Sequence, residues 1–263
     1  MNNQKSGTVF GIFVFIIVIL TGILIYSLNS KPKVLVVSGH PEWAPIMWQS
    51  GNKIIGAGPD LMEKICVDLK IVCDVKATGI WDEVQEKTKS GETDILVAAY
   101  KTDARMEYMN YSDPYTTDPI SVFVKNGSNF NYTKWDDLIG KKGVLTTGDS
   151  YGQEFDSFIK DKLTTTRVDT AKEAFDKVTS GNADYLIYAL YSGKSEIKKE
   201  NLTDKIVALP KKVTEENFYI TISKKSPFVK LMPKINELIE KYKSDGTIDK
   251  MISSNEELSG LNK

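Results

Sequence analysis

The sequence predicts an α/β protein, because short apolar runs alternate along it with longer stretches whose apolar residues recur at helical spacing. Asp94–Ala99 is the clearest strand and Phe228–Tyr242 the clearest helix. A further observation is an internal repeat. In residues 90–97, and again in residues 180–188, a predicted helix ends at the glycine of a Gly-x-x-Asp motif, and a buried strand follows the motif.

Composition and charge narrow the class of protein. The chain has 263 residues, of which 41% are hydrophobic and 26% charged, and this suits one large or two small globular domains. The net charge of −1 gives no electrostatic case for binding nucleic acid. His40 is the only histidine and has no partners at metal-ligand spacing, so we predict neither a metal site nor a cofactor.

The N-terminal segment, residues 1–29, is a predicted membrane anchor or signal segment. Residues 8–28 contain no charge and no proline, and as a helix they would span about 31 Å. A signal-peptide core has only roughly 7–15 apolar residues, and no Ala-x-Ala cleavage site follows. We therefore predict an uncleaved single-span anchor, with a cleaved signal peptide as the alternative. In both cases the rest of the chain is exported.

The two cysteines, Cys66 and Cys73, agree with export. One lies near the end of a predicted helix and the other in the strand that follows. Such a chain reversal can bring two Cα atoms within disulfide range, and an oxidising compartment preserves the bond. We predict a disulfide, with two buried free thiols as the alternative.

The first half of the chain alternates between predicted strands and helices. Runs of β-branched residues bounded by turn residues predict the strands, and apolar residues at four-residue spacing predict the helices. In order, we predict a strand at Lys33–Ser38, a helix from Pro59 to Leu69, a strand at Ile71–Val75, a helix from Gly79 to Ser90, and strands at Asp94–Ala99 and Pro119–Lys125.

The second half continues the alternation. We predict helices from about Gln153 and at Ala171–Ser180, a strand at 184–188, strands at Ile206–Leu209 and Asn217–Ser223, a helix at Phe228–Tyr242, and a short helix after a turn at 244–248. From Glu256 the sequence is polar, and we expect a frayed tail.

Arg105 is the first candidate binding residue. It follows the predicted strand Asp94–Ala99, and open α/β sheets place their ligands beyond the carboxyl ends of such strands. Its planar guanidinium can grip a carboxylate with two parallel hydrogen bonds. The alternative is a surface arginine paired with Asp103 or Glu107.

The residues around Arg105 resemble a motif of the type-3 extracellular solute-binding proteins, the amino-acid receptors of ABC importers. The matching positions are Gly91, Asp94, Thr102, Arg105, Ser112, Pro114 and Tyr115. The resemblance extends from Lys33 to the C-terminus. It implies a two-lobed, type II periplasmic-binding-protein-like fold with a hinge of two crossing segments. Lobe 1 would comprise residues 33–121 plus 216–263, and lobe 2 residues 122–215.

The resemblance also implies a set of ligand-binding residues. In the family the arginine holds the ligand's carboxylate, an aromatic residue at the position of Trp43 stacks on the ligand, and the position of Trp81 often supplies a contact. Core packing is the alternative for Trp81. A Gly-Ser loop before a helix is a natural anion site, with a plain N-cap as the alternative. The predicted set is Arg105, Trp43, Trp81, Tyr100, Ala98, Ser150, Asp149 and Tyr151, with His40 and Glu42 at the pocket edge.

The chain departs from the family pattern at Ala189. Many amino-acid-binding relatives have an aspartate there, which pairs with the ligand's ammonium group. The departure leaves the identity of the ligand open.

The resemblance implies a monomeric binding protein on the periplasmic or extracellular face. It would bind a small carboxylate-bearing solute, such as a polar amino acid or a close relative, for delivery to an ABC permease. One alternative is a ligand-sensing module for another inner-membrane partner. A second is a dehydratase-type enzyme on the same fold, but the sequence offers no nucleophile–base pair, and we predict no catalysis.

Overall fold

The computed structural model describes residues 33–260. The chain divides into a unit of residues 1–34 and a unit of residues 35–263, and the second unit carries the fold described below. The predicted anchor, residues 8–28, lies outside the described residues. Among the described helices, none combines the length and the apolar character that a membrane crossing requires.

Unit 35–263 is built on one mixed sheet with the strand order β5-β1-β6-β11-β7-β10-β8-β9. The three strands at one end are parallel, as are the three at the other end, and both groups pair antiparallel with the two central strands. The strands are β5 (Cys73–Val75), β1 (Leu35–Ser38), β6 (Ile95–Ala99), β11 (Ile206–Ser223), β7 (Met109–Lys125), β10 (Tyr185–Ala189), β8 (Lys142–Thr146) and β9 (Thr164–Val168).

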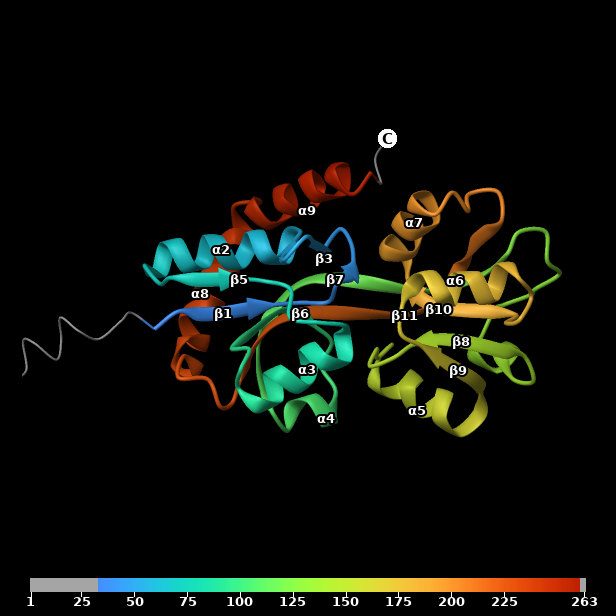
Figure 1. Ribbon diagram of the computed structural model, residues 1–263, viewed down its shortest axis with the longest axis horizontal. Coiled ribbons are helices and arrows are strands. Elements are labelled where there is room, and N and C mark those ends of the chain that lie inside the picture. Colours follow the sequence, from blue (N-terminus) through green and yellow to red (C-terminus); the bar gives the residue numbers. More distant parts are fainter. Residues whose placement is uncertain (1–32, 261–263) are drawn as a thin grey trace, which may run out of the picture. The chain divides into compact units, whose positions relative to one another are not determined.

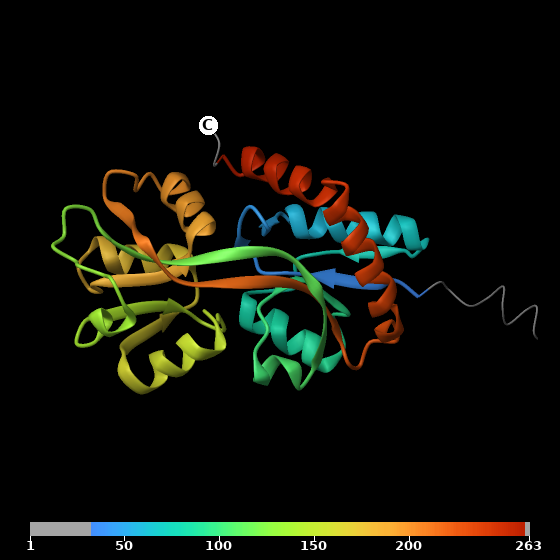
Figure 2. The ribbon, with the colours of Figure 1, turned by 180° about the vertical axis from the view of Figure 1, so that it is seen from behind.

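Helices cover both faces of each end of the sheet (Figures 1 and 2). Around β5, β1 and β6 lie α2 (Ala57–Leu69), α3 (Trp81–Ser90), α4 (Asp103–Met106), α8 (Met232–Ser244) and α9 (Thr247–Leu258). Around β10, β8 and β9 lie α5 (Gln153–Lys162), α6 (Ala171–Thr179) and α7 (Leu190–Lys199). The long strands β7 and β11 run from one group to the other (Figure 1), so the fold is the expected two-lobed α/β architecture.

Short elements complete the fold. A separate small sheet contains β2 (Glu42–Trp43), β3 (Met47–Ser50) and β4 (Lys53–Ile55), and the 3-10 helices are η1 (Trp135–Leu138) and η2 (Val229–Leu231). The small sheet follows β1 directly, and it holds Trp43 in a strand that the sequence did not predict.

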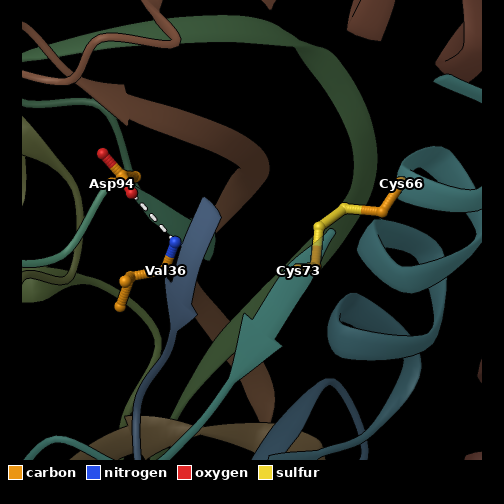
Figure 3. The surroundings of a disulfide bond; sticks show 4 residues. All are labelled: Val36, Cys66, Cys73 and Asp94. Atoms are coloured by element: carbon orange, nitrogen blue, oxygen red, sulfur yellow. Dashed lines mark hydrogen bonds between the residues drawn. A yellow bond between two sulfur atoms is a disulfide. The ribbon is translucent and has the colours of Figure 1, made fainter. Parts of the chain in front are cut away.

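The repeated Gly-x-x-Asp motif performs one task in both lobes. Asp94 accepts a hydrogen bond from the N–H of Val36 at 2.9 Å (Figure 3). Asp184 accepts one from the N–H of Lys142 at 2.7 Å. Each aspartate therefore bonds the backbone near the start of the neighbouring parallel strand, while the strand that follows it, β6 or β10, is buried along its whole length.

The predicted disulfide is confirmed. Cys66 in α2 and Cys73 in β5 are bonded, with their Cα atoms 6.3 Å apart (Figure 3). The bond ties a covering helix to the edge strand of the sheet.

Several predicted elements differ in length or were missed. Strand β7 begins at Met109, ten residues before the prediction, and β11 is one strand where two were expected. Each of these strands mixes buried and exposed positions irregularly, so neither shows a clean alternation, and register shifts interrupt their pairing. Helix α7 was not predicted, because its N-cap residue Ala189 gives no capping signal. The prediction of a frayed tail from Glu256 is also wrong, since α9 continues to Leu258.

Candidate functional site

The candidate site is a small cavity beyond the carboxyl ends of β1, β6 and β8. This is the location that open α/β sheets favour for ligands. Eleven residues line it: His40, Trp43, Met47, Trp81, Ala98, Ala99, Tyr100, Arg105, Asp149, Ser150 and Phe218.

Arg105 reaches this cavity from α4, a four-residue helix whose N-terminus is capped by the hydroxyl of Thr102. Only 6% of Arg105 is exposed. Its guanidinium donates from Nε to the side-chain oxygen of Gln85 (3.0 Å), from Nη1 to the carbonyl of Tyr100 (3.3 Å), and from Nη2 to the carbonyl of Gly148 (3.0 Å).

All three acceptors of Arg105 are uncharged. Within residues 33–260, no carboxylate lies at ion-pair distance from the guanidinium. The surface-pair interpretation with Asp103 or Glu107 is therefore wrong. The guanidinium carbon also lies 5.4 Å from the centre of the Trp81 ring, so one face of the cation rests on that indole.

The loop 147–152 faces Arg105 from the other lobe. Gly148 has a φ of 76°, a conformation that glycine adopts without steric cost. The backbone N–H groups of Gly148, Asp149 and Ser150 donate no hydrogen bond to another described residue. The Ser150 hydroxyl is already engaged, because it donates to Asp156 and accepts from the N–H of Gly152.

This loop can therefore offer an anion its backbone amides but not the Ser150 hydroxyl. The simple N-cap interpretation of Ser150 or Asp149 is wrong, because α5 begins at Gln153 after an N-cap at Gly152.

His40 is held as a neutral imidazole. Its Nδ1 accepts a hydrogen bond from the N–H of Glu42 at 3.0 Å, so this nitrogen carries no proton. The proton then sits on Nε2, which donates to one oxygen of Asp149 at 3.1 Å. The hydroxyl of Thr146 donates to the other oxygen. Each oxygen of Asp149 thus accepts one side-chain donor of the protein.

Asp118, in β7, is a site residue that sequence reasoning missed. One of its oxygens accepts from the indole N–H of Trp43 at 2.6 Å and from the hydroxyl of Tyr100 at 2.5 Å. Only 3% of Asp118 is exposed, and burial raises its pKa to about 6, against the lowering effect of the two hydrogen bonds. An acidic residue inside the predicted strand region was the only available signal, and the sequence does not show that it is buried.

Aromatic rings fill most of the cavity wall. The ring centroids of His40 and Trp43 are 4.7 Å apart, those of Trp43 and Tyr100 6.2 Å, and those of Tyr100 and Phe218 4.9 Å. Trp81 closes the set, 5.1 Å from His40. Phe218 was not predicted, because it comes from the return strand β11, far away in sequence.

Two predicted site residues do not line the cavity. Glu42 turns its carboxylate to the N–H of Ala171, at the start of α6, at 2.8 Å, and burial raises the pKa of Glu42. Tyr151 is fully buried behind the loop, with its hydroxyl at Thr146. Ala189 is also buried, at the end of β10, and does not line the cavity.

Hydrogen bonds already join the two sides of the site. Besides the Arg105–Gly148 and Glu42–Ala171 contacts, the hydroxyl of Ser192 donates to the carbonyl of Ala44 at 2.9 Å, and the hydroxyl of Tyr188 donates to the carbonyl of Glu42 at 3.1 Å. The structure is therefore a closed one.

Comparison with known proteins identifies the family. Residues 35–254 match the family model of the bacterial extracellular solute-binding proteins, family 3. The chain belongs to this family. The resemblance found in the sequence is thus confirmed, and the family is one of binding proteins.

Individual relatives agree in fold and extent. The probable amino-acid-binding protein YxeM of Bacillus subtilis (strain 168) is 25% identical over 232 residues, covering 86% of this chain and 84% of that protein. The amino acid ABC transporter substrate-binding protein AbpA of Streptococcus pneumoniae, solved bound to L-arginine, has a TM-score of 0.71 at 22% identity, covering 86% and 95%. A histidine kinase sensor domain with similarity to periplasmic binding proteins has a TM-score of 0.74 at 20% identity, covering 85% and 96%.

Proposed function

We propose that this protein binds a small carboxylate-bearing solute outside the cytoplasm, an amino acid or a close relative, and delivers it to an ABC importer. The observation that carries the proposal is the buried guanidinium of Arg105, which lines the cavity and whose hydrogen-bond partners in the described part of the chain are all uncharged. A buried cation is stabilised by a partner of opposite charge, and a ligand carboxylate suits its planar fork.

The opposing loop supports this assignment. The free N–H groups of residues 148–150 and the guanidinium of Arg105 approach the same cavity from the two lobes. An anion between them would receive hydrogen bonds from both sides and would hold the lobes together. We accordingly retain residues 33–121 plus 216–263 and residues 122–215 as the two proposed lobes, which close by a hinge motion.

The relatives indicate the ligand class and the delivery partner. YxeM is described as a probable amino-acid-binding protein, and AbpA as an amino acid ABC transporter substrate-binding protein. Anchoring by residues 8–28 would keep the binding protein beside its permease. We propose that the protein acts as a monomer.

Replacing Arg105 tests the proposal. The purified full-length chain is first screened by thermal shift against amino acids, dicarboxylates and small peptides, and the best ligand is titrated by calorimetry. Losing one partner of a buried, hydrogen-bonded charge pair costs about 2–5 kcal/mol. Arg105→Ala should therefore weaken binding by at least about thirtyfold, and Arg105→Lys should weaken it less because it keeps the charge.

Lys101→Ala is the matched control, because it removes an exposed cation four positions away. Unchanged affinity in a folded Arg105→Ala protein would refute the carboxylate assignment.

A sensory role is the second candidate, and the histidine kinase sensor domain of similar fold is the observation that favours it. Affinity purification of the full-length chain from its native membrane distinguishes the two roles. Co-purification of a permease with its ATPase supports import, and co-purification of a kinase or cyclase supports sensing.

A further inference from the structure

The cavity has an unusual balance of charge and aromatic surface. Five of its lining residues carry an aromatic ring: His40, Trp43, Trp81, Tyr100 and Phe218. Two carboxylates lie at or behind this wall, Asp149 and Asp118, and neither has a lysine or arginine partner among the described residues. The part of the wall formed by Trp43 and Tyr100 therefore combines apolar ring surface with nearby negative charge.

The aromatic wall is coupled to the carboxylate of Asp118. Trp43 and Tyr100 both donate to the same oxygen of Asp118, so a negative charge sits on the polar edges of the two rings. A cation against the ring faces is attracted by their quadrupoles, and the nearby negative charge adds to that attraction. His40 does not oppose it, since its imidazole is neutral.

The carboxylates at this wall already accept hydrogen bonds from the protein's own donors, which compete with a ligand N–H group. Asp149 receives donors on both oxygens, from His40 and Thr146. The oxygen of Asp118 that faces the cavity aromatics receives two donors. A primary ammonium group needs acceptors for its N–H groups when it is buried, and unmet donors are costly. A fully methylated ammonium has no N–H group and carries no such cost.

We propose that the site selects a small carboxylate that carries a quaternary, methylated ammonium, that is, a betaine. The carboxylate binds Arg105 and the 148–150 amides, and the methylated cation binds the faces of Trp43 and Tyr100. The two subsites adjoin, because Arg105 donates to the Tyr100 carbonyl at 3.3 Å, so the two charges of the ligand must be close together. This inference rests on the proposed function, since it uses the same carboxylate clamp.

Three small carboxylates that differ in the group opposite the carboxylate test the inference. Their binding to the full-length protein is measured by titration calorimetry. Glycine betaine has the carboxylate and the methylated cation. In 3,3-dimethylbutanoate, which has the same shape and the same carboxylate, a neutral tert-butyl group replaces the cation. Glycine has the same carboxylate with a primary ammonium. We expect glycine betaine to bind at least about tenfold more tightly than either of the other two. Equal binding of 3,3-dimethylbutanoate, or tighter binding of glycine, would overturn the inference.

Variants separate the aromatic contribution from the carboxylate clamp. Trp43→Leu should lower glycine betaine affinity by about tenfold or more, and Trp43→Phe, which keeps a ring face, should retain most of it. Trp48→Leu is the control, because Trp48 lies outside the cavity. An equal loss in Trp43→Phe and Trp43→Leu would count against the ring face as the cation site.

The failure of this inference is distinguishable from that of the proposed function. If glycine betaine does not bind but another amino acid binds in an Arg105-dependent manner, the betaine inference is refuted and the proposed function stands. If every carboxylate tested binds equally well to wild type and to folded Arg105→Ala protein, both are refuted.

Discussion

Asp118 is a buried carboxylate, and its hydrogen-bond donors among residues 33–260 are two aromatic side chains of the cavity. Its pKa is raised to about 6, whereas an unfolded aspartate titrates near about 3.9. Between these values the folded protein binds more protons than the unfolded chain, so this group makes the free energy of unfolding fall as pH rises from about 4 to about 6. Two pKa units correspond to roughly 3 kcal/mol.

Asp118→Asn should remove this pH dependence. We subtract the free energy of unfolding of wild type from that of the variant, each measured by urea denaturation. This difference should be larger at pH 7 than at pH 4 by on the order of 2–3 kcal/mol. Asp113→Asn, at an exposed position of the same strand, is the matched control. A wild-type-minus-variant difference that stays constant across this range would contradict the prediction.

At the same scale, much of the cavity was predictable from the sequence. The motif around Arg105 and the aromatic positions Trp43 and Trp81 led to residues that do line one cavity. Asp118 and Phe218 were not predicted, because their roles depend on where the long strands pass, and local sequence does not specify that. The prediction for Glu42 failed in a different way. It was expected at the pocket edge, but its carboxylate bonds the first turn of α6 in the other lobe.

At the scale of elements, the Cys66–Cys73 bond joins α2 to the edge strand β5. Closing so short a loop limits the unfolded chain, and the loop-entropy model gives roughly 2–3 kcal/mol. Replacing both cysteines by serine should lower the free energy of unfolding by that amount in urea denaturation.

Chemical reduction of the wild type should produce a similar loss, and the same reductant should leave the double-serine variant unaffected. A double-serine variant as stable as the oxidised wild type would show that the native contacts of α2 and β5 already suffice.

Element prediction succeeded where burial is uniform and failed where it is mixed. The fully buried strands β6 and β10 appear as continuous apolar runs, and each is introduced by the same Gly-x-x-Asp motif. Strands β7 and β11 mix exposed and buried residues, and their continuity comes from pairing with each other over most of their length. That pairing is a long-range property, so local sequence showed only fragments of the two strands.

At the scale of the whole molecule, closure depends on contacts that exist only when the lobes meet. Glu42 accepts from the N–H of Ala171 across the site, and a hydrogen bond to a charged group contributes about 1.5–3 kcal/mol. Glu42→Ala should shift the population toward the open form and weaken ligand binding by about tenfold or more.

Small-angle X-ray scattering should show a larger radius of gyration for unliganded Glu42→Ala protein than for wild type. Glu63→Ala, at an exposed position of α2, controls for loss of a surface charge. The same radius and the same affinity in the Glu42 variant would mean that this contact does not govern closure.

The pairing of β7 with β11 has one further consequence. Lys125, the last residue of β7, pairs with Ile206, the first residue of β11. The two ends of segment 126–205 therefore meet in space, as the ends of an inserted unit do, and the segment returns strand β10 to pair with β7. A protein built in this way can exchange that segment as a cassette, which would allow one half of the ligand site to diversify while the other half stays constant.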